Sequence, residues 1–262
     1  MQNIIFFDID GTIVTEDKDM IIPESTVKAI KLAQKKGNLT FINSGRPAFN
    51  ISPRIREMGF DGYICGCGTY IEYKGEELFY ASLDTDFCRE IALKLRDSNV
   101  TPVYERKDRY YFDDKAVSTP ELEEFKEIFI SEGIRTDGLV EDDDFSFDKL
   151  VLWTNENSNT AMFRKALEKD FDIIDRGNGF FENVPKKYSK STGIQYILDK
   201  LNIPRDNAYA IGDSTNDLPM LRAVPNSIAM GGAKKLYPYV SYITTPILEN
   251  GIYNALDHFD LI

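Results

Sequence analysis

Continuous apolar runs of strand length alternate with helical apolar periodicity over residues 1–80. Uninterrupted apolar runs are typical of parallel strands that are covered on both faces. Val27, Ile30 and Ala33 recur on one side of a helix expected over 23–36. This alternation predicts a doubly wound α/β fold. The expected strands are residues 4–7, 39–43, 63–64, 71–73 and 78–80, and the expected helices are 23–36 and 48–58.

The pattern changes after residue 83 and returns after residue 185. Two short strands around residues 107–108 form a hairpin pattern, which is more typical of an antiparallel sheet. We therefore expect a Rossmann-like core from 1–83 and 186–262, with an α+β domain inserted at 84–185. The expected strands of the insertion are 102–106, 110–113, 149–154, 171–175 and 180–184, and its helices are 84–99, 120–132 and 159–169. In the second segment of the core, residues 186–262, the expected helices are 190–201, 217–223 and 251–259. The expected strands there are 208–211, 227–230 and 242–244.

Two aspartates, Asp8 and Asp10, directly follow the first apolar run. Side chains two residues apart on an extended backbone point to the same side. In open α/β sheets the crevice beyond the carboxyl ends of the strands is where ligands bind. The pair therefore indicates a ligand site, although a capping aspartate followed by a turn aspartate explains the same pattern.

Polar residues follow other expected core strands in the same way. Ser44-Gly45 follows 39–43, Asp213 and Asp217 follow 208–211, and Lys190 begins a helix. Together with Asp8 and Asp10, these polar residues at strand ends and at a helix start suggest a site for a metal ion and a phosphate group. Each residue has a structural alternative: Ser44 as a helix cap, Lys190 as a solvated residue at a helix start, and Asn216 as a turn residue.

Composition narrows the classes of partner and chemistry. A net charge of −12 argues against nucleic acid or an anionic membrane as the main partner. Three cysteines are too few for a disulfide framework and indicate a reduced, cytoplasmic protein; Cys65 and Cys67 are interpreted as small strand residues. The single histidine, His258, lies in an expected surface helix, so a Ser-His-Asp mechanism is improbable. We expect neither a secretory signal nor a membrane span.

Four motifs occur in one order: DIDGT, SGR, a lysine before a helix, and GDSTND. Together they resemble the motifs of the haloacid dehalogenase (HAD) superfamily, and the second aspartate followed by Gly-Thr is similar to its phosphatases. The insertion and the late segments 228–231 and 249–251 look like the Cof-type subfamily with its large α/β cap. The chain departs from that subfamily at 67–69 and 231–233, and neither departure touches the four motifs.

The resemblance implies a role for each motif. Asp8 would be the nucleophile that forms an aspartyl-phosphate, and Asp10 would protonate the leaving alcohol and then activate water. The phosphate-binding residues would be Ser44, Gly45 through its N–H, Lys190 and Asn216. Arg46 is left outside this group as a structural or supporting residue.

A divalent cation is expected because the site carries excess negative charge. Asp8, Asp10, Asp213 and Asp217 contribute up to four negative charges, which Lys190 alone does not balance. Oxygen ligands suit Mg²⁺. The expected ligands are the side chains of Asp8 and Asp213 and the backbone carbonyl of Asp10, with Asp217 binding directly or through another ligand.

The expected function is therefore Mg²⁺-dependent hydrolysis of a small organic phosphate monoester, such as a sugar phosphate or a phosphorylated cofactor. The alternatives are a phosphosugar mutase and a non-catalytic phosphate sensor. The inserted domain would close over the site and set specificity, and its Tyr104, Tyr110 and Tyr111 are interpreted as core residues. The expected assembly is a monomer or a weak homodimer.

Overall fold

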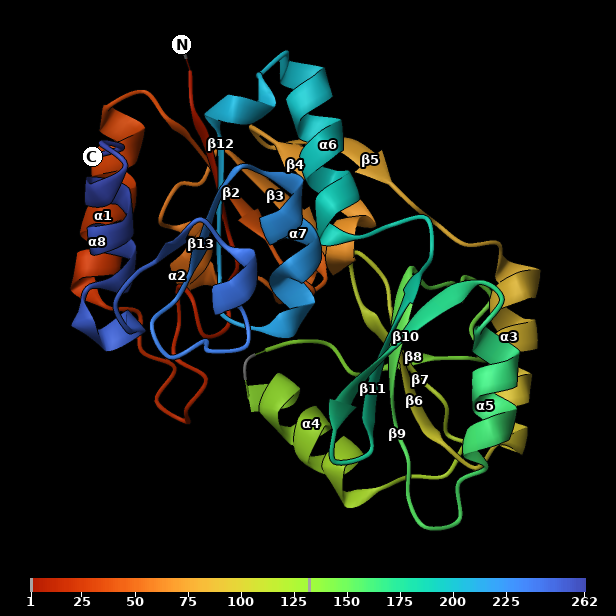
Figure 1. Cartoon of the computed structure of the whole chain (residues 1–262). Helices are drawn as coiled ribbons and strands as arrows, with labels where there is room; N and C mark the ends of the chain where they lie inside the picture. The colour runs from red at the N-terminus through yellow and green to blue at the C-terminus, as the bar shows by residue number, and fades with distance from the viewer. Residues whose placement is uncertain (1, 132) are drawn as a thin grey trace. The chain divides into compact units, whose positions relative to one another are not determined.

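The apolar runs form an eight-stranded sheet in the computed structural model, which describes residues 2–131 and 133–262 (Figure 1). The strand order is β14-β13-β12-β1-β2-β3-β4-β5. Pairing is parallel from β14 to β3, and β4 is antiparallel to β3. The strands are β1 (Ile4–Phe7), β2 (Leu39–Asn43), β3 (Gly62–Cys65), β4 (Tyr70–Tyr73), β5 (Glu76–Tyr80), β12 (Ala208–Gly212), β13 (Asn226–Ala229) and β14 (Tyr242–Ile243).

Strand β1 lies at the centre of this sheet, between β12 and β2. The chain runs outward through β2 and β3 on one side and through β12, β13 and β14 on the other. All four residues of β1 are buried, as expected for a strand covered on both faces. The reversal of strand order beside β1 makes the carboxyl ends of β1 and β12 the place for a ligand.

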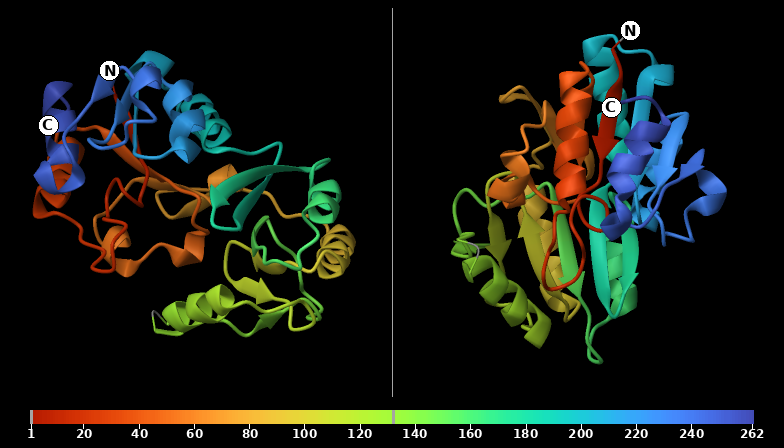
Figure 2. Two further views of the ribbon diagram at one scale, coloured as in Figure 1. Left: turned by 60° about the horizontal axis from the view of Figure 1, so that its bottom comes forward. Right: turned by 90° about the vertical axis from the view of Figure 1, so that its left-hand side faces the viewer.

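Helices cover both faces of the sheet (Figures 1 and 2). Helices α1 and α8 lie side by side on one face, where Lys36 Nζ donates to the backbone carbonyl oxygen of Asp260 at 2.6 Å. Helices α6 and α7 lie together on the other and pack against a core that includes Phe6 and Phe41. The helices are α1 (Glu24–Lys35), α2 (Pro53–Arg56), α6 (Lys190–Leu201), α7 (Leu218–Ala223) and α8 (Gly251–His258).

The single helix expected over 48–58 is wrong. A 3₁₀ turn at Ala48–Asn50 is separated from the short helix α2, which begins at Pro53. Proline disfavours helical geometry in the residue before it, and Ser52 is accordingly extended, with φ −57° and ψ 148°. Proline then serves as the first residue of α2.

The chain divides into two units. The first comprises residues up to Arg46, Ile51–Phe79 and Tyr188–Ile262, and the second comprises Pro47–Asn50 and Tyr80–Lys187. These divisions fall at 79/80 and 187/188, whereas the sequence pattern suggested 83/84 and 185/186. The inserted segment forms a unit with its own sheet and its own core.

The second unit contains a six-stranded sheet in the order β10-β11-β9-β6-β7-β8. Its pairs are antiparallel except β7 with β8, a short strand that the apolar pattern did not predict. The strands are β6 (Thr101–Glu105), β7 (Tyr110–Phe112), β8 (Gly138–Leu139), β9 (Lys149–Trp153), β10 (Phe171–Gly177) and β11 (Phe180–Pro185). The helices are α3 (Thr85–Asp97), α4 (Pro120–Ser131) and α5 (Thr160–Leu167), and residue 132 of the expected helix lies outside the described residues.

The two faces of the second sheet bury separate apolar clusters. Tyr104 and Tyr111 pack with α3 and α5 on one face, and Tyr110 packs with Phe129 of α4 on the other. All three tyrosines are buried, which confirms their interpretation as core residues. Within the described residues, no helix combines the length and apolar character needed to cross a membrane.

Candidate active site

Parallel pairing of β1 with β12 brings two aspartates together at the carboxyl end of the sheet. Phe7 is in register with Ile211, and the Asp8 N–H donates to the Ile211 carbonyl oxygen at 3.0 Å. Asp213 follows Gly212, the last residue of β12. Two residues far apart in sequence therefore leave adjacent strands at the same level.

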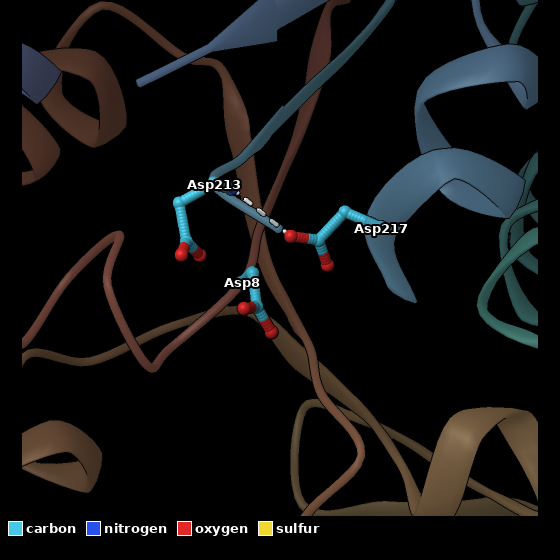
Figure 3. A group of neighbouring side chains, drawn as sticks. All are labelled: Asp8, Asp213 and Asp217. Carbon is cyan, nitrogen blue, oxygen red and sulfur yellow. Dashed lines mark hydrogen bonds between the residues drawn. The ribbon is translucent and has the colours of Figure 1, made fainter. Parts of the chain in front are cut away.

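Three carboxyl groups converge at this point: those of Asp8, Asp213 and Asp217 (Figure 3). Each offers one oxygen atom, and these atoms lie within 4.8 Å of one another. Asp8 and Asp217 are buried, and Asp213 is partly exposed. Asp217 belongs to the 3₁₀ turn Thr215–Asp217, which leads directly into α7.

Lys190 joins two of these carboxylates. Its Nζ donates to Asp8 Oδ1 and to Asp217 Oδ1, each at 2.6 Å. The side chain is only 2% exposed, so Lys190 is not a solvated helix-start residue. The buried Asn43 side chain donates to the Lys190 carbonyl oxygen at 3.0 Å and anchors the start of α6.

Burial and mutual repulsion disfavour ionisation of the carboxyl groups. Burial, and then the charge of Asp217, raise the pKa of Asp8 well above its usual range, although Lys190 opposes them. Burial, with the charges of Asp217 and Glu16, raises the pKa of Asp213 to about 7. Burial alone would lower the pKa of Lys190, but Asp217 and Asp8 outweigh it and raise that pKa, so the lysine stays charged.

Backbone geometry holds the carboxylates of Asp213 and Asp217 in place. Asp217 Oδ2 accepts a hydrogen bond from the Asp213 N–H at 3.0 Å (Figure 3). It also accepts one from the Ser214 N–H at 3.1 Å. A Cβ atom at Gly212 would lie 2.6 Å from the Asp217 carboxyl group, and one at Gly11 would lie 2.2 Å from Asp213 Oδ2. These two glycines therefore leave the space that the carboxylates occupy.

Asp10, like Asp8, lies in the loop that follows β1, but the partner of its side chain is Arg46. Arg46 Nε donates to Asp10 Oδ2 at 3.0 Å, and Arg46 Nη2 donates to Asp10 Oδ1 at 2.6 Å. The expectation that Asp10 ligates a metal through its backbone carbonyl stays a prediction. Arg46 was not expected in the core of the site, yet a cation directly after Ser-Gly at a strand end was a visible signal for it.

The remaining expected residues occupy the same edge of the sheet or a neighbouring turn. Ser44 follows β2 and is buried, and its Oγ accepts a hydrogen bond from the Arg46 N–H at 3.2 Å. Gly45 lies between them. The Asn216 side-chain oxygen and the Ser214 hydroxyl form a hydrogen bond within their own turn. The roles of Ser44, Gly45 and Asn216 toward phosphate stay predictions.

The residues present fit a divalent cation such as Mg²⁺. Three carboxylates carry three negative charges, and Lys190 supplies one positive charge, so two negative charges remain uncompensated in a largely buried group when all three are ionised. Carboxylate oxygens are the ligands that Mg²⁺ prefers. Asp8, Asp213 and Asp217 are therefore the side chains that would hold it.

A pocket of about 360 Å³ borders this group. Gly11 and Asp213 line one part of it, and segment 231–233 lines another. That segment is one of the two places where the chain departs from the Cof-type pattern, so the departure borders the candidate metal site.

Comparisons with known proteins identify the family of this chain. The profile of the haloacid dehalogenase-like hydrolases matches residues 5–256. A Bacillus subtilis (strain 168) protein named "Putative phosphatase YkrA" is 29% identical, covering 100% of this chain and 99% of its own. From the same organism, 5-amino-6-(5-phospho-D-ribitylamino)uracil phosphatase YcsE is 23% identical over 98% and 96% of the two chains. A solved structure described as the HAD subclass IIB sugar phosphatase BT4131 is 26% identical, covers 99% of this chain and 100% of its own, and has a TM-score of 0.81.

These findings confirm the expected α/β fold with its inserted unit and the expected enzyme class, a hydrolase of the phosphatase type. The profile match extends over both units of the chain. On the evidence of its fold, its carboxylate group and this match, the chain belongs to the haloacid dehalogenase-like hydrolases.

Proposed function

We propose that this enzyme hydrolyses small organic phosphate monoesters with Mg²⁺ and through an aspartyl-phosphate on Asp8. The observation that carries the proposal is the buried group in which Lys190 contacts both Asp8 and Asp217 beside Asp213. Such a group positions a carboxylate nucleophile next to fixed positive charge, at the edge of the sheet where ligands bind.

In the first step a carboxylate oxygen of Asp8 attacks phosphorus, and the bond between phosphorus and the leaving oxygen breaks. Asp10 gives its proton to that oxygen, so a neutral alcohol departs. In the second step Asp10 takes a proton from water, whose oxygen attacks phosphorus. The bond from phosphorus to Asp8 then breaks, which returns inorganic phosphate and the Asp8 carboxylate.

Fixed donors would stabilise the phosphoryl group during both steps. Lys190 supplies a positive charge beside Asp8, while the Ser44 hydroxyl and the Gly45 N–H are proposed to donate to phosphoryl oxygens. When bound by Asp8, Asp213 and Asp217, Mg²⁺ would neutralise charge on these carboxylates and on the phosphoryl oxygens.

The proposed substrates are phosphate esters of polyhydroxylated carbon chains, and sugar phosphates are the leading class. One similar structure is described as a sugar phosphatase, and one relative is named for a phosphorylated ribityl compound. We assign recognition of the leaving group to the inserted unit, whose sheet and core are its own.

The variant Asp8→Asn tests the nucleophile. Phosphate release from p-nitrophenyl phosphate with Mg²⁺ should fall to background, because a carboxamide does not form the acyl phosphate. The matched control is Asp257→Asn, which makes the same chemical change at an exposed residue of α8 and should keep the wild-type rate.

Chelation and product analysis test the remaining parts of the proposal. Excess chelator should abolish turnover, and added Mg²⁺ should restore it. A panel of phosphorylated metabolites should release inorganic phosphate rather than an isomerised phosphosugar. Wild-type turnover in Asp8→Asn, full activity in chelator, or isomerisation without phosphate release would each contradict the proposal.

A further inference from the structure

Arg46 and Asp10 form a two-pronged ion pair at the edge of the candidate active site. The Nε and Nη2 atoms of Arg46 each donate to a different carboxylate oxygen of Asp10, at 3.0 and 2.6 Å. A planar guanidinium that binds both oxygens fixes the orientation of a carboxylate as well as balancing its charge. The plane of the Asp10 carboxyl group is therefore set by Arg46.

The backbone on both sides of this pair is also fixed. The Arg46 N–H donates to Ser44 Oγ at 3.2 Å, and the Arg46 carbonyl oxygen accepts from the Gly66 N–H at 2.9 Å. On the other side, the Gly11 N–H donates to the Val14 carbonyl oxygen at 2.8 Å and closes the turn after Asp10. The main freedom left to Asp10 is rotation of its side chain, and Arg46 restrains that rotation.

We propose that Arg46 is a positioning residue that orients Asp10 for proton transfer to the leaving group. This inference rests on the proposed function, in which Asp10 supplies that proton. Both oxygens of the Asp10 carboxylate accept from Arg46 in this ion pair. One prong of the guanidinium must therefore be released so that this oxygen takes up the proton that Asp10 gives to the leaving group, while the other prong still directs the carboxyl group. The loop at residues 44–46 thereby links the Ser44 end of the site to the proton-transferring end.

The dependence of kcat/KM on the leaving group separates this positioning role from a merely structural one. Phenyl phosphate and p-nitrophenyl phosphate are similar in shape, but p-nitrophenolate departs readily without a proton and phenolate does not. The kcat/KM values report the steps up to formation of the phosphoenzyme, in which Asp10 acts as the acid. A defect confined to acid catalysis therefore slows phenyl phosphate selectively, whereas a distorted phosphate site slows both esters alike.

The test measures both kcat/KM values for wild type, Arg46→Lys and Arg46→Ala. Lysine keeps the charge but loses the two-pronged geometry. We expect the loss for phenyl phosphate to exceed the loss for p-nitrophenyl phosphate by about tenfold in Arg46→Lys and by more in Arg46→Ala, since acid–base catalysis contributes about 10²–10⁴-fold. Should Arg46→Ala not fold, Arg46→Lys supplies the comparison.

Two controls define the interpretation. Arg135 forms an ion pair of the same geometry with Asp137, at 3.0 and 2.8 Å and at an exposed position, so Arg135→Lys should change neither value. In an Asp10→Asn background, Arg46→Lys should add no further selectivity, because the group that it positions is already disabled.

The inference is overturned if Arg46→Lys lowers both esters equally, if it lowers neither, or if the selective loss persists in the Asp10→Asn background. Failure of the proposed function would appear separately and earlier. In that case the wild-type enzyme would release no phosphate from either ester in the presence of Mg²⁺.

Discussion

Lys190 occupies a position that is unfavourable for a lysine taken by itself. It is the first residue of α6, where the helix dipole disfavours positive charge, and its side chain is buried. Contacts at 2.6 Å with Asp8 and Asp217 compensate for both costs. The same contacts account for only one of the three carboxylate charges, which is why the residues of the site favour a cation.

The raised pKa of Asp213 predicts that Mg²⁺ binding is coupled to proton release. Burial is the main cause of the shift to about 7, so metal-free Asp213 is largely protonated at about pH 6. A metal ligand must be deprotonated. Mg²⁺ affinity should therefore fall as the pH is lowered from about 8 to about 6, and binding at pH 6 should release close to one proton from Asp213. Calorimetric titration in buffers of different ionisation enthalpy measures both quantities.

Glu16 supplies the control for this prediction. Its charge contributes to the raised pKa of Asp213, and it is exposed. Glu16→Gln should therefore reduce proton release at about pH 7. An affinity that does not change with pH, together with no proton release, would show that Asp213 is not a protonated ligand in the metal-free enzyme.

At the scale of elements, the turn after β1 lies closely against the residue that follows β12. Gly11 has φ +76°, a conformation that glycine adopts at little cost. It also lies against the Asp213 carboxyl group, so the turn needs glycine for space as well as for its backbone angle. A close approach between two loops that are about 200 residues apart in sequence thus determines the position of a candidate metal ligand.

The variant Gly11→Ala should lose Mg²⁺ binding and stability together. Its Cβ would meet Asp213 Oδ2 at 2.2 Å, and the left-handed backbone adds about 1–2 kcal/mol of strain. Gly37→Ala is the matched control, because Gly37 has φ +92° but no heavy atom within 4 Å of the added Cβ. Urea unfolding and calorimetric Mg²⁺ titration should show strain alone in Gly37→Ala. Equal effects of the two substitutions would contradict a role for the Gly11–Asp213 contact.

At the scale of the whole molecule, the two units have separate interiors, and the second contains a buried charge triad. Lys149 on β9 lies 3.1 Å from Glu105 on β6 and 2.8 Å from Glu182 on β11. All three side chains are almost fully buried. Burial raises the pKa of Glu105 to about 6, although Lys149 opposes that shift. Lys149 therefore links three neighbouring strands of the inserted unit.

Lys149→Met should destabilise the second unit by about 3 kcal/mol or more, because it removes the buried cation that both carboxyl groups contact. A carboxyl group with a raised pKa binds more protons in the folded state, so stability should fall as the pH rises through the window from about 4.5 to above 6. The variant should thus be more stable at about pH 5 than at about pH 8. Fluorescence of Trp153, the single tryptophan, reports unfolding of this unit.

Lys115→Met is the matched control in the same unit, because Lys115 pairs with Glu141 at an exposed site. Its cost should be within about 1 kcal/mol. Mg²⁺ binding by the carboxylate group of the first unit should persist in Lys149→Met while the protein is folded. A loss of stability no larger than that of Lys115→Met would show that the triad is not needed.

Much of the architecture could be predicted from the sequence pattern. Apolar runs located β1 and β2, and helical periodicity located α1 and α3 to within two residues of their observed limits. These features depend on local pattern and on the need to bury apolar faces. Local reasoning was wrong at 48–58, where Pro53 interrupts the helix, and it missed β8, whose two residues are too few to show a period.

The same distinction between local pattern and tertiary structure applies to the candidate site. The sequence by itself determined which polar residues lie at the ends of core strands and at the start of a helix, because such ends and motifs are local features. These candidates were Asp8, Asp10, Ser44, Lys190, Asp213 and Asp217. Only the tertiary structure decided which of them meet. Lys190 contacts Asp8 across 182 positions of sequence, and Asp10 turns to Arg46 across 36. Those partnerships follow from the order and register of the strands, which no local pattern specifies.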